Sequence, residues 1–282
     1  MYDPLIDESL PGNSPYPNSY WANVAGTAPE DDGQLNKDIT VDVAIIGAGY
    51  TGLSTALHLV REHGIKATVL EANRTAWGAS GRNAGFILKS SGRKPYACMQ
   101  SQWGEEVMRG IYNEMCAGVD TVKDFISEGI DCDPQDNGYI RVAHKPGMLK
   151  SLLATAALQK QMFGYDVQAL TREQLHQEYM ADHNAYGAIR YQDGFGINPL
   201  KLAWGYQELA RKAGVTIHCD SPVDKWHQES SNKAAQQSQT TQILHTPNGI
   251  VKAKKVVIAT NGYSAKNLHP LIQSKSLPVL SQ

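Results

Sequence analysis

The sequence predicts an α/β fold, with one domain built on a parallel sheet and a β-meander and a second α+β domain with a mixed or antiparallel sheet. Three observations support this prediction. Two short apolar runs flank a helical stretch near residue 50, helical repeats of apolar residues fill the middle, and alternating runs follow near the C-terminus. A length of 282 residues with 41% hydrophobic residues suits two globular domains and excludes disorder.

The first elements form a βαβ unit. Residues 41–46 and 66–71 predict buried strands, and residues 49–63 predict a helix that ends at Gly64. Parallel strands need such a crossover helix, so both strands belong to one parallel sheet. Residues 43–60 carry no charged side chain, but their glycines and polar residues favour a strand, a turn and a helix over a membrane span.

Two long amphipathic helices come next. Residues 105–126 repeat apolar side chains every three or four positions, which predicts a buried face formed by Val107, Ile111, Met115, Val119, Val122 and Ile126. Residues 146–163 predict the second helix, whose buried face is formed by Met148, Leu149, Leu152, Leu153 and Ala156.

Short elements surround these helices. Residues 138–143 and 186–192 alternate like strands, and Thr171 with Gln174 forms a capping box that predicts a short helix. Asn198 and Pro199 begin a helix that ends at Gly214. The remaining predictions are a strand at 215–219, a polar hairpin tip within 228–242, and meander strands at 242–246 and 250–260.

These elements divide the chain into an arm and two discontinuous domains. The arm has little predicted structure of its own, because it is rich in proline and small polar residues, and Tyr16, Tyr20 and Trp21 are its candidate anchors. The predicted bounds are 1–37 for the arm, 38–96 with 195–271 for a nucleotide-binding domain, and 97–194 with 272–282 for a substrate domain.

The composition indicates which kinds of partner and which cellular compartment suit the chain. The 26 basic and 28 acidic residues form no basic cluster, so nucleic acid is excluded as the main partner. The four cysteines lie far apart and the histidines show no metal-binding spacing, which predicts a reducing compartment and no metal site. The first 36 residues contain six acids and no Lys or Arg, unlike a targeting signal, so we expect a cytoplasmic protein.

One motif carries the chemistry. Gly47, Gly49 and Gly52 follow a strand and open a helix, which is the Rossmann-type context for binding a pyrophosphate at a helix N-terminus. The first glycine permits the tight turn, the second lets the phosphate approach, and the third lets the helix pack on the strand. Glu71 ends the next strand, where its carboxylate can accept hydrogen bonds from a ribose. The sequence therefore predicts a dinucleotide site.

NAD and FAD both satisfy this motif, and two further segments favour FAD. Residues 77–85 supply small and polar residues where a long cofactor extends beyond its pyrophosphate. Residues 256–262 form a strand that ends in small residues and can return to the same sheet. The motif and these segments place the predicted FAD contacts at Gly47, Ala48, Gly49, Tyr50, Thr51, Gly52, Glu71, Ala72, Ala79, Ser80, Asn83, Gly85, Thr260, Asn261 and Gly262.

Together, the segments 47–52, 78–83, 194–199 and 259–262 with Glu71 resemble the D-amino-acid-oxidase-like family of FAD-dependent amine oxidoreductases. The chain is most similar to its gamma-glutamylputrescine oxidases, with which it shares the Ser-Tyr-Trp arm. The resemblance implies that the turn holds the pyrophosphate, that Glu71 holds the ribose, that Ser80 and Asn83 lie on the phosphate and flavin side, and that the Val223 backbone meets the adenine.

The same resemblance implies the reaction. A primary or secondary amine, gamma-glutamylputrescine-like or an amino acid, would pass a hydride to flavin N5, the imine would hydrolyse to an aldehyde or keto product, and oxygen or another acceptor would reoxidise the flavin, with oxygen giving hydrogen peroxide. This chemistry demands no general base, so no catalytic residue is assigned. The implied role is polyamine catabolism.

Two alternatives stay open. One is an NAD-dependent dehydrogenase built on the same motif. The other is a non-catalytic fragment or a flavin-binding subunit of a larger amine dehydrogenase, because members of the family are longer. Residues 277–280 form an apolar run that predicts the start of a strand without a following partner, so we expect a chain that is incomplete as a catalyst.

Overall fold

The computed structural model describes residues 12–90, 92, 94–165, 167–230, 240–264 and 268–269. The chain divides into two compact units. The first comprises Met1–Ala84, Ile130–Cys132 and Asn198–Gln282, and the second comprises Gly85–Gly129 and Asp133–Ile197. The boundary after Ala84 falls before the one at residue 96 that the sequence suggests, and the arm belongs to the first unit.

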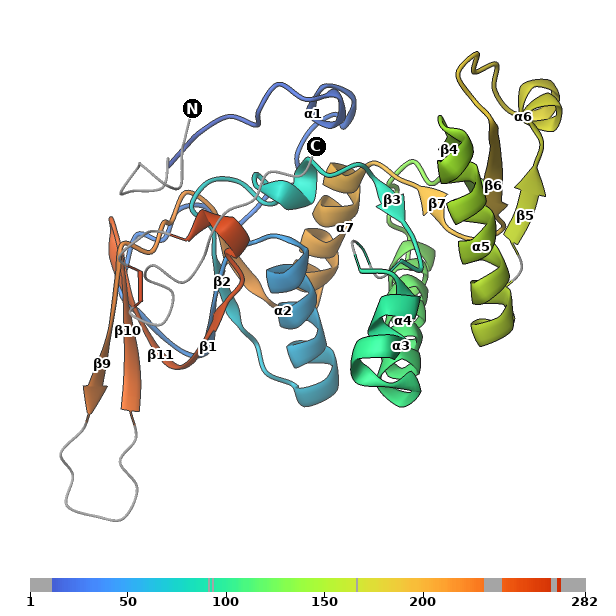
Figure 1. Ribbon diagram of the computed structural model, residues 1–282. Coiled ribbons are helices and arrows are strands. Elements are labelled where there is room, and N and C mark those ends of the chain that lie inside the picture. The colour runs from blue at the N-terminus through green and yellow to red at the C-terminus, as the bar shows by residue number, and fades with distance from the viewer. Residues whose placement is uncertain are drawn as a thin grey trace. The chain divides into compact units, whose positions relative to one another are not determined.

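The first unit contains a six-stranded sheet, with helices α2 (Tyr50–His63) and α7 (Pro199–Lys212) beside it (Figure 1). The order of the sheet is β8-β2-β1-β11-β10-β9, and the strands from β8 to β11 run parallel, whereas β11, β10 and β9 form an antiparallel meander. The strands are β1 (Ile39–Ile46), β2 (Thr68–Leu70), β8 (Thr216–His218), β9 (Lys225–Ser230), β10 (Thr240–Thr246) and β11 (Gly249–Ile258). The predicted parallel sheet with a meander is confirmed, including the return of the last strand beside the first.

The burial of strand β1 changes along its length, according to how far other elements cover the sheet. Its first four residues alternate between intermediate and exposed, whereas Val43–Ile46 are all buried. The buried half includes the residues that pair with both β2 and β11, and α2 (Tyr50–His63) packs against this part of the sheet. Both faces are therefore covered where β1 enters the glycine turn, which explains the uninterrupted apolar run.

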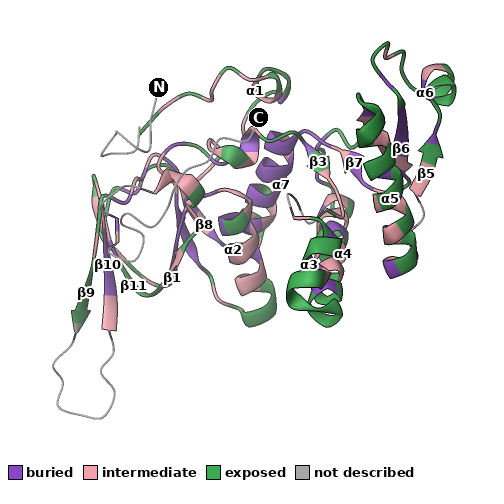
Figure 2. Ribbon diagram, in the orientation of Figure 1, coloured by how far each residue is buried: buried purple, intermediate pink, exposed green. Residues whose placement is uncertain are grey.

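Helices α2 and α7 (Pro199–Lys212) pack against each other and against parallel strands of the sheet. The helix α2 ends at Gly64, which has a φ of 65°, as the sequence predicts. The side chain of Asn198 caps α7 by accepting hydrogen bonds from the N–H groups of Leu200 and Lys201. Figure 2 shows that α7 is largely buried, so it is the central helix of this unit.

The second unit contains a three-stranded antiparallel sheet with the order β4-β6-β5. Helices α5 and α6 pack on this sheet, α3 packs on α4, and β3 pairs with β7. The elements are β3 (Phe86–Ile87), α3 (Tyr96–Trp103), α4 (Glu105–Ser127), β4 (Tyr139–Ala143), α5 (Pro146–Phe163), β5 (Val167–Leu170), α6 (Arg172–Glu178), β6 (Gly187–Tyr191) and β7 (Phe195–Gly196). The predicted α+β unit is confirmed, with an antiparallel sheet.

The buried faces of the two long helices agree with the prediction in part, since Val119 of α4 is buried as predicted. Val107 is 49% exposed, because α4 instead turns Met108 into a cluster with Tyr96, Met99 and Met162. On α5, Leu152 is buried as predicted and packs with Ile189 and Tyr191 of the sheet, and Leu149 and Ala156 lie against the same cluster, whereas Met148 and Leu153 are exposed. Apolar residues beside the buried stripe of a helix also fit the helical spacing, so the spacing alone does not tell which of them are buried. The element that packs against the helix decides it.

The N-terminal arm has more structure than the sequence predicts. It contains a short helix, α1 (Tyr20–Val24), which the Ser19 side chain caps. Tyr16 and Trp21 pack against a cluster that includes Trp204, and they serve as the predicted anchors. Tyr20 does not anchor the arm, because it is 70% exposed.

Some predictions lie outside the described residues. These are the apolar run at 277–280 and the tip within 231–239 between β9 and β10. Within the described part of the chain, no helix combines the length and the apolar composition that crossing a membrane requires.

Candidate functional site

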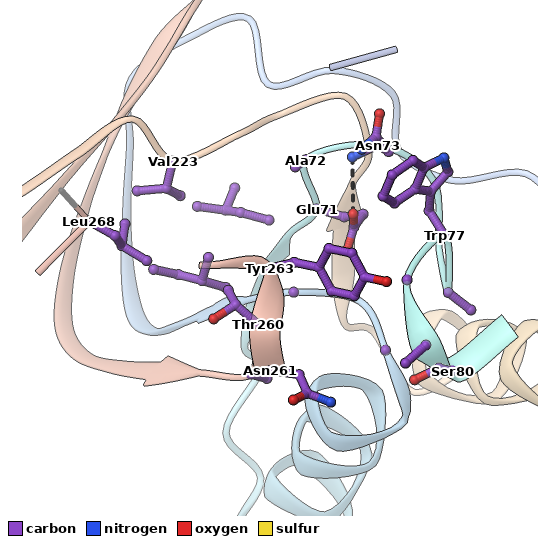
Figure 3. Close-up of a pocket in the computed structure, with 18 residues that line it drawn as sticks. Glu71, Ala72, Asn73, Trp77, Ser80, Val223, Thr260, Asn261, Tyr263 and Leu268 are labelled. Carbon is purple, nitrogen blue, oxygen red and sulfur yellow. Dashed lines mark hydrogen bonds between the residues drawn. The ribbon is translucent and has the colours of Figure 1, made fainter. Parts of the chain in front are cut away.

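A pocket in the first unit lies where three neighbouring strands end. Ile46 and Leu70 are the last residues of β1 and β2, and Ala259 directly follows β11. Because these strands are parallel neighbours, their carboxyl ends meet at one edge of the sheet, the usual ligand position in such folds. The lining residues are Ile46, Gly47, Gly49, Leu70, Glu71, Ala72, Asn73, Ala76, Trp77, Gly78, Ala79, Ser80, Val223, Ala259, Thr260, Asn261, Tyr263 and Leu268 (Figure 3).

The glycine turn has no room for side chains at its first and third glycines. Gly47 has a φ of 107°, and a Cβ there would lie 2.6 Å from the carbonyl oxygen of Ala259. A Cβ at Gly52 would lie 1.9 Å from the carbonyl oxygen of Gly47. At Gly49 the nearest atom is the Ser80 Oγ, at 2.8 Å, so this glycine faces a side chain of the pocket rather than backbone. The roles predicted for the first and third glycines are thus visible as steric limits.

The N-terminus of α2 faces the pocket. Its N-cap residue, Gly49, offers no side-chain cap, and the first turn contains no acidic residue. The Tyr50 N–H donates a hydrogen bond to the Ser80 Oγ at 3.1 Å. A helix N-terminus carries partial positive charge and unpaired N–H groups, so it favours an anion such as phosphate. Ser80 stands where its hydroxyl can contact the same anion.

Glu71 follows β2 and points into the pocket (Figure 3). Its Oε2 accepts a hydrogen bond from the Ala48 N–H at 2.8 Å, and its Oε1 accepts one from the Asn73 N–H at 3.0 Å. Burial raises the pKa of this carboxyl group, although these N–H groups and that of Ala72 act in the opposite direction. Further donors, such as a pair of ligand hydroxyls, would stabilise the charged carboxylate.

The loop from Asn73 to Asn83 is held against the turn by its backbone. The Ala76 N–H donates to the Ala48 carbonyl at 2.9 Å, and the Gly81 N–H donates to the Ala76 carbonyl at 3.1 Å. Ala76 has a φ of 59°, a conformation that costs about 1 to 3 kcal/mol for a non-glycine residue. Asn261, which also lines the pocket, has a φ of 49°. Strained backbone on two sides of one pocket is typical of a functional site.

An aromatic clamp joins the loop to the segment after β11. The Trp77 and Tyr263 rings meet edge to face with centroids 5.9 Å apart. The Arg82 guanidinium lies 4.8 Å from the Trp77 ring centroid, and its Nη2 donates to the Tyr263 hydroxyl at 3.0 Å. Sequence reasoning missed Trp77 and Tyr263, although each directly neighbours a glycine of a predicted segment.

Nine of the sixteen predicted contact residues line this pocket: Gly47, Gly49, Glu71, Ala72, Ala79, Ser80, Val223, Thr260 and Asn261. Ala48, Tyr50, Thr51 and Gly52 belong to the turn and to α2 but are not among the lining residues, Asn83 ends the loop, and Gly262 lies in the short 3-10 helix η2 (Asn261–Tyr263). Gly85 belongs to the second unit. The described residues contain no group of three or more His, Cys, Asp or Glu side chains placed to hold a metal ion.

The arrangement fits a dinucleotide. Partial positive charge at α2 suits a pyrophosphate, the Glu71 carboxylate beside it suits a ribose diol, and Val223, Leu70 and Leu268 give an apolar wall. The acidic Glu71 disfavours a 2′-phosphate, because two negative charges would meet.

Comparison with known proteins agrees with this geometry. The model of the family described as "DAO: FAD dependent oxidoreductase" matches residues 42–282. The gamma-glutamylputrescine oxidoreductase of Escherichia coli is 32% identical over 271 residues, which are 94% of this chain and 59% of that protein. The sarcosine oxidase subunit beta of an Arthrobacter species is 27% identical, over 79% of this chain and 52% of that protein.

Solved structures share the fold. Glycine oxidase from Geobacillus kaustophilus superposes with a TM-score of 0.61 at 21% identity and covers 81% of this chain and 57% of its own. The L-amino acid deaminase from Proteus vulgaris gives a TM-score of 0.60 at 20% identity, over 83% of this chain and 50% of its own. The chain thus spans between half and three-fifths of the length of these relatives.

Proposed function

The chain belongs to the DAO family of FAD-dependent oxidoreductases, and from this premise we propose that it carries the FAD site of an enzyme that oxidises a carbon–nitrogen bond of a small amine or amino acid. One observation carries the proposal most directly. A helix N-terminus without its own cap and a carboxylate that holds the adjacent turn line the same pocket at the carboxyl edge of a parallel sheet.

Residues of this chain would hold FAD as follows. The backbone of Gly47–Gly52 binds the pyrophosphate, and Ser80 and Asn83 lie on the phosphate and flavin side. Glu71 accepts the ribose hydroxyls, and the Val223 backbone meets the adenine. FAD, when bound, supplies the two-electron acceptor for the oxidation. The protein contributes orientation of the amine and exclusion of water.

FAD is favoured over NAD by the comparisons, since the matching family is described as FAD-dependent. The further parts of the proposal concern the whole protein. The substrate is a primary or secondary amine, either gamma-glutamylputrescine-like or an amino acid, and oxygen accepts the electrons to give hydrogen peroxide. We also propose a cytoplasmic role in polyamine catabolism, a compartment that suits the four free cysteines.

A second candidate is a flavin-bearing subunit that needs a partner chain for turnover. The 27% identity to a protein named as the beta subunit of sarcosine oxidase supports it. Co-purification from the native source distinguishes the two. A stoichiometric second polypeptide that is required for amine oxidation would favour the subunit.

Flavin binding by a matched pair of variants tests the site. We expect Gly49→Asp to abolish FAD binding, because the new carboxylate would occupy the phosphate position at the start of α2. The control is Gly147→Asp, which makes the same change in the first turn of α5, where no atom lies within 4 Å of an added Cβ. Retained stoichiometric flavin in Gly49→Asp would reject the site.

Turnover tests the reaction. The wild-type protein, with any partner it requires, should form peroxide with a panel of amines and amino acids and not with the matching hydroxy acids. Oxidation of hydroxy acids without amine activity would reject the amine assignment and leave the FAD site intact.

A further inference from the structure

The N-terminal arm is hydrogen-bonded to the loop that lines the pocket. Four bonds join residues 14–21 of the arm to residues 73–83 of the loop. The Ser14 N–H donates to the Asn73 Oδ1 at 2.9 Å, the Tyr16 hydroxyl to the Thr75 carbonyl at 2.7 Å, the Trp77 Nε1 to the Pro15 carbonyl at 2.9 Å, and the Trp21 Nε1 to the Asn83 carbonyl at 2.8 Å. The contacts reach both ends of the loop, and pocket residues lie between them.

The arm is itself anchored on the central helix of the unit. The Trp204 Nε1 of α7 donates to the Tyr16 hydroxyl at 3.0 Å, and the two rings meet edge to face. Burial raises the pKa of Tyr16 to about 12, so the hydroxyl keeps its proton and remains a donor to Thr75. Trp21 packs in the same cluster, which also contains Ala76 of the loop. The arm therefore connects the largely buried helix α7 to the loop.

A short chain of hydrogen bonds leads from Trp21 to the phosphate position. Trp21 holds the carbonyl of Asn83, and the Asn83 side-chain amide donates to the Ser80 carbonyl at 2.9 Å. The Ser80 hydroxyl in turn accepts the Tyr50 N–H at the start of α2. A displacement of Asn83 would thus move Ser80 relative to the helix N-terminus.

We propose that Tyr16 and Trp21 are positioning residues of the FAD site, which hold the 73–83 loop in the conformation that binds the cofactor. The inference rests on the proposed function, because it takes FAD as the occupant of the pocket. A loop that is ordered before binding loses less conformational entropy when the ligand arrives, so its anchors increase affinity without touching the ligand.

Two conservative variants test the assignment in the full chain. Trp21→Phe removes the indole N–H and keeps a ring, and Tyr16→Phe removes the hydroxyl. Trp21→Phe should weaken FAD binding roughly 2- to 12-fold, the range for one net hydrogen bond, and Tyr16→Phe at least as much, because its hydroxyl makes two. The matched control is Tyr20→Phe, which alters the exposed neighbour and should leave the affinity unchanged. Titration of the apoprotein with FAD, followed by flavin fluorescence, gives the dissociation constants.

A double-mutant cycle separates positioning from general stability. Ser80→Ala removes the group through which Trp21 acts, so Trp21→Phe should cost less affinity in the Ser80→Ala background than in the wild type. A merely structural residue would give the same fold-change in both backgrounds. Thermal melts of the apoproteins identify any variant that does not fold. If Tyr16→Phe does not fold, the affinities measured with Trp21→Phe decide the test.

The outcomes are distinct. Weaker binding by Trp21→Phe, coupled to Ser80, supports the inference. Unchanged affinity, fold-changes that are additive with Ser80→Ala, or an equal loss in Tyr20→Phe overturns it while the proposed function stands. A wild-type chain that binds no FAD overturns the proposed function, and this inference with it.

Discussion

The glycines of the turn before α2 lie against other backbone atoms, whereas those of helix α4 have open space around them. Added Cβ atoms at Gly47 and Gly52 would lie within 2.6 Å of backbone carbonyl oxygens, whereas those at Gly110 and Gly118 would meet no atom within 4 Å. Backbone cannot move aside as a flexible side chain can. The first unit therefore requires glycine at its site, whereas α4 of the second unit merely contains it.

The most severe test of this comparison is Gly52→Ala. The new methyl group would overlap the Gly47 carbonyl and force α2 away from the turn, so we expect a loss of about 3 kcal/mol in the free energy of unfolding. Urea unfolding followed by circular dichroism measures it. A loss below about 1 kcal/mol would show that the turn can relax, and the contrast with α4 would then fail.

The variant Glu71→Ala tests whether the Glu71 side chain, like the glycines, maintains the conformation of the turn. Its removal leaves the Ala48 and Asn73 N–H groups without their acceptor and takes away the proposed ribose contact. Hydrogen bonds to a charged acceptor contribute about 1.5 to 3 kcal/mol, so FAD binding should weaken by about 10- to 150-fold. Flavin titration measures the change, and Glu62→Ala, at an exposed position of α2, is the control. An unchanged affinity would remove Glu71 from the ribose position.

Local patterns explain what the sequence predicts well. The bounds of α5 agree with the prediction residue for residue, because Pro146 begins the helix and Gly164, with a φ of 67°, follows its end. The glycine turn and Glu71 are equally local, since strand, turn and helix follow one another along the chain. Such signals need no knowledge of distant residues.

The remaining parts of the site depend on contacts between distant segments. Trp77 pairs with Tyr263, and Trp21 bonds to the Asn83 carbonyl 62 residues away. An aromatic residue beside glycine does not identify its partner in sequence, and a carbonyl acceptor is present at every position. The left-handed conformation of Ala76 is similarly hidden, because alanine does not indicate it and the hydrogen bond to Ala48 arises only in the fold.

We expect a smaller loss of unfolding free energy from a substitution at the edge of the sheet, where the arm meets β8. Asp32 exchanges hydrogen bonds with Ile217: its N–H donates to the Ile217 carbonyl, and its Oδ2 accepts the Ile217 N–H at 2.8 Å. Arg211 also donates to its carboxylate, at 3.0 Å. Burial opposes the charge, but these donors outweigh it and hold the pKa of Asp32 below its ordinary value of 3.8.

Asp32→Asn should therefore cost about 1 kcal/mol of unfolding free energy at neutral pH, allowing for solvent screening of a partly exposed pair. Because the folded-state pKa is lowered, this contribution is present above the unfolded pKa and is lost as pH falls through the folded pKa. The unfolding free energies of the two proteins should begin to converge as the pH falls below about 4 and become equal only below the folded-state pKa of Asp32. A difference independent of pH would assign the effect to packing rather than to charge.

The smallest change in the free energy of unfolding is expected for Gly118→Ala in α4, and it is an increase rather than a loss. Gly118 is exposed, lies within Glu105–Ser127, and has open space where a Cβ would stand. Glycine inside a helix costs about 0.5 to 1 kcal/mol relative to alanine, chiefly because the unfolded chain loses more freedom on folding. The variant should gain up to that amount in urea unfolding, and its FAD affinity should not change. If Gly118→Ala destabilised the protein as Gly52→Ala is expected to, the open space around α4 would be filled in solution, and position alone would not separate the two kinds of glycine.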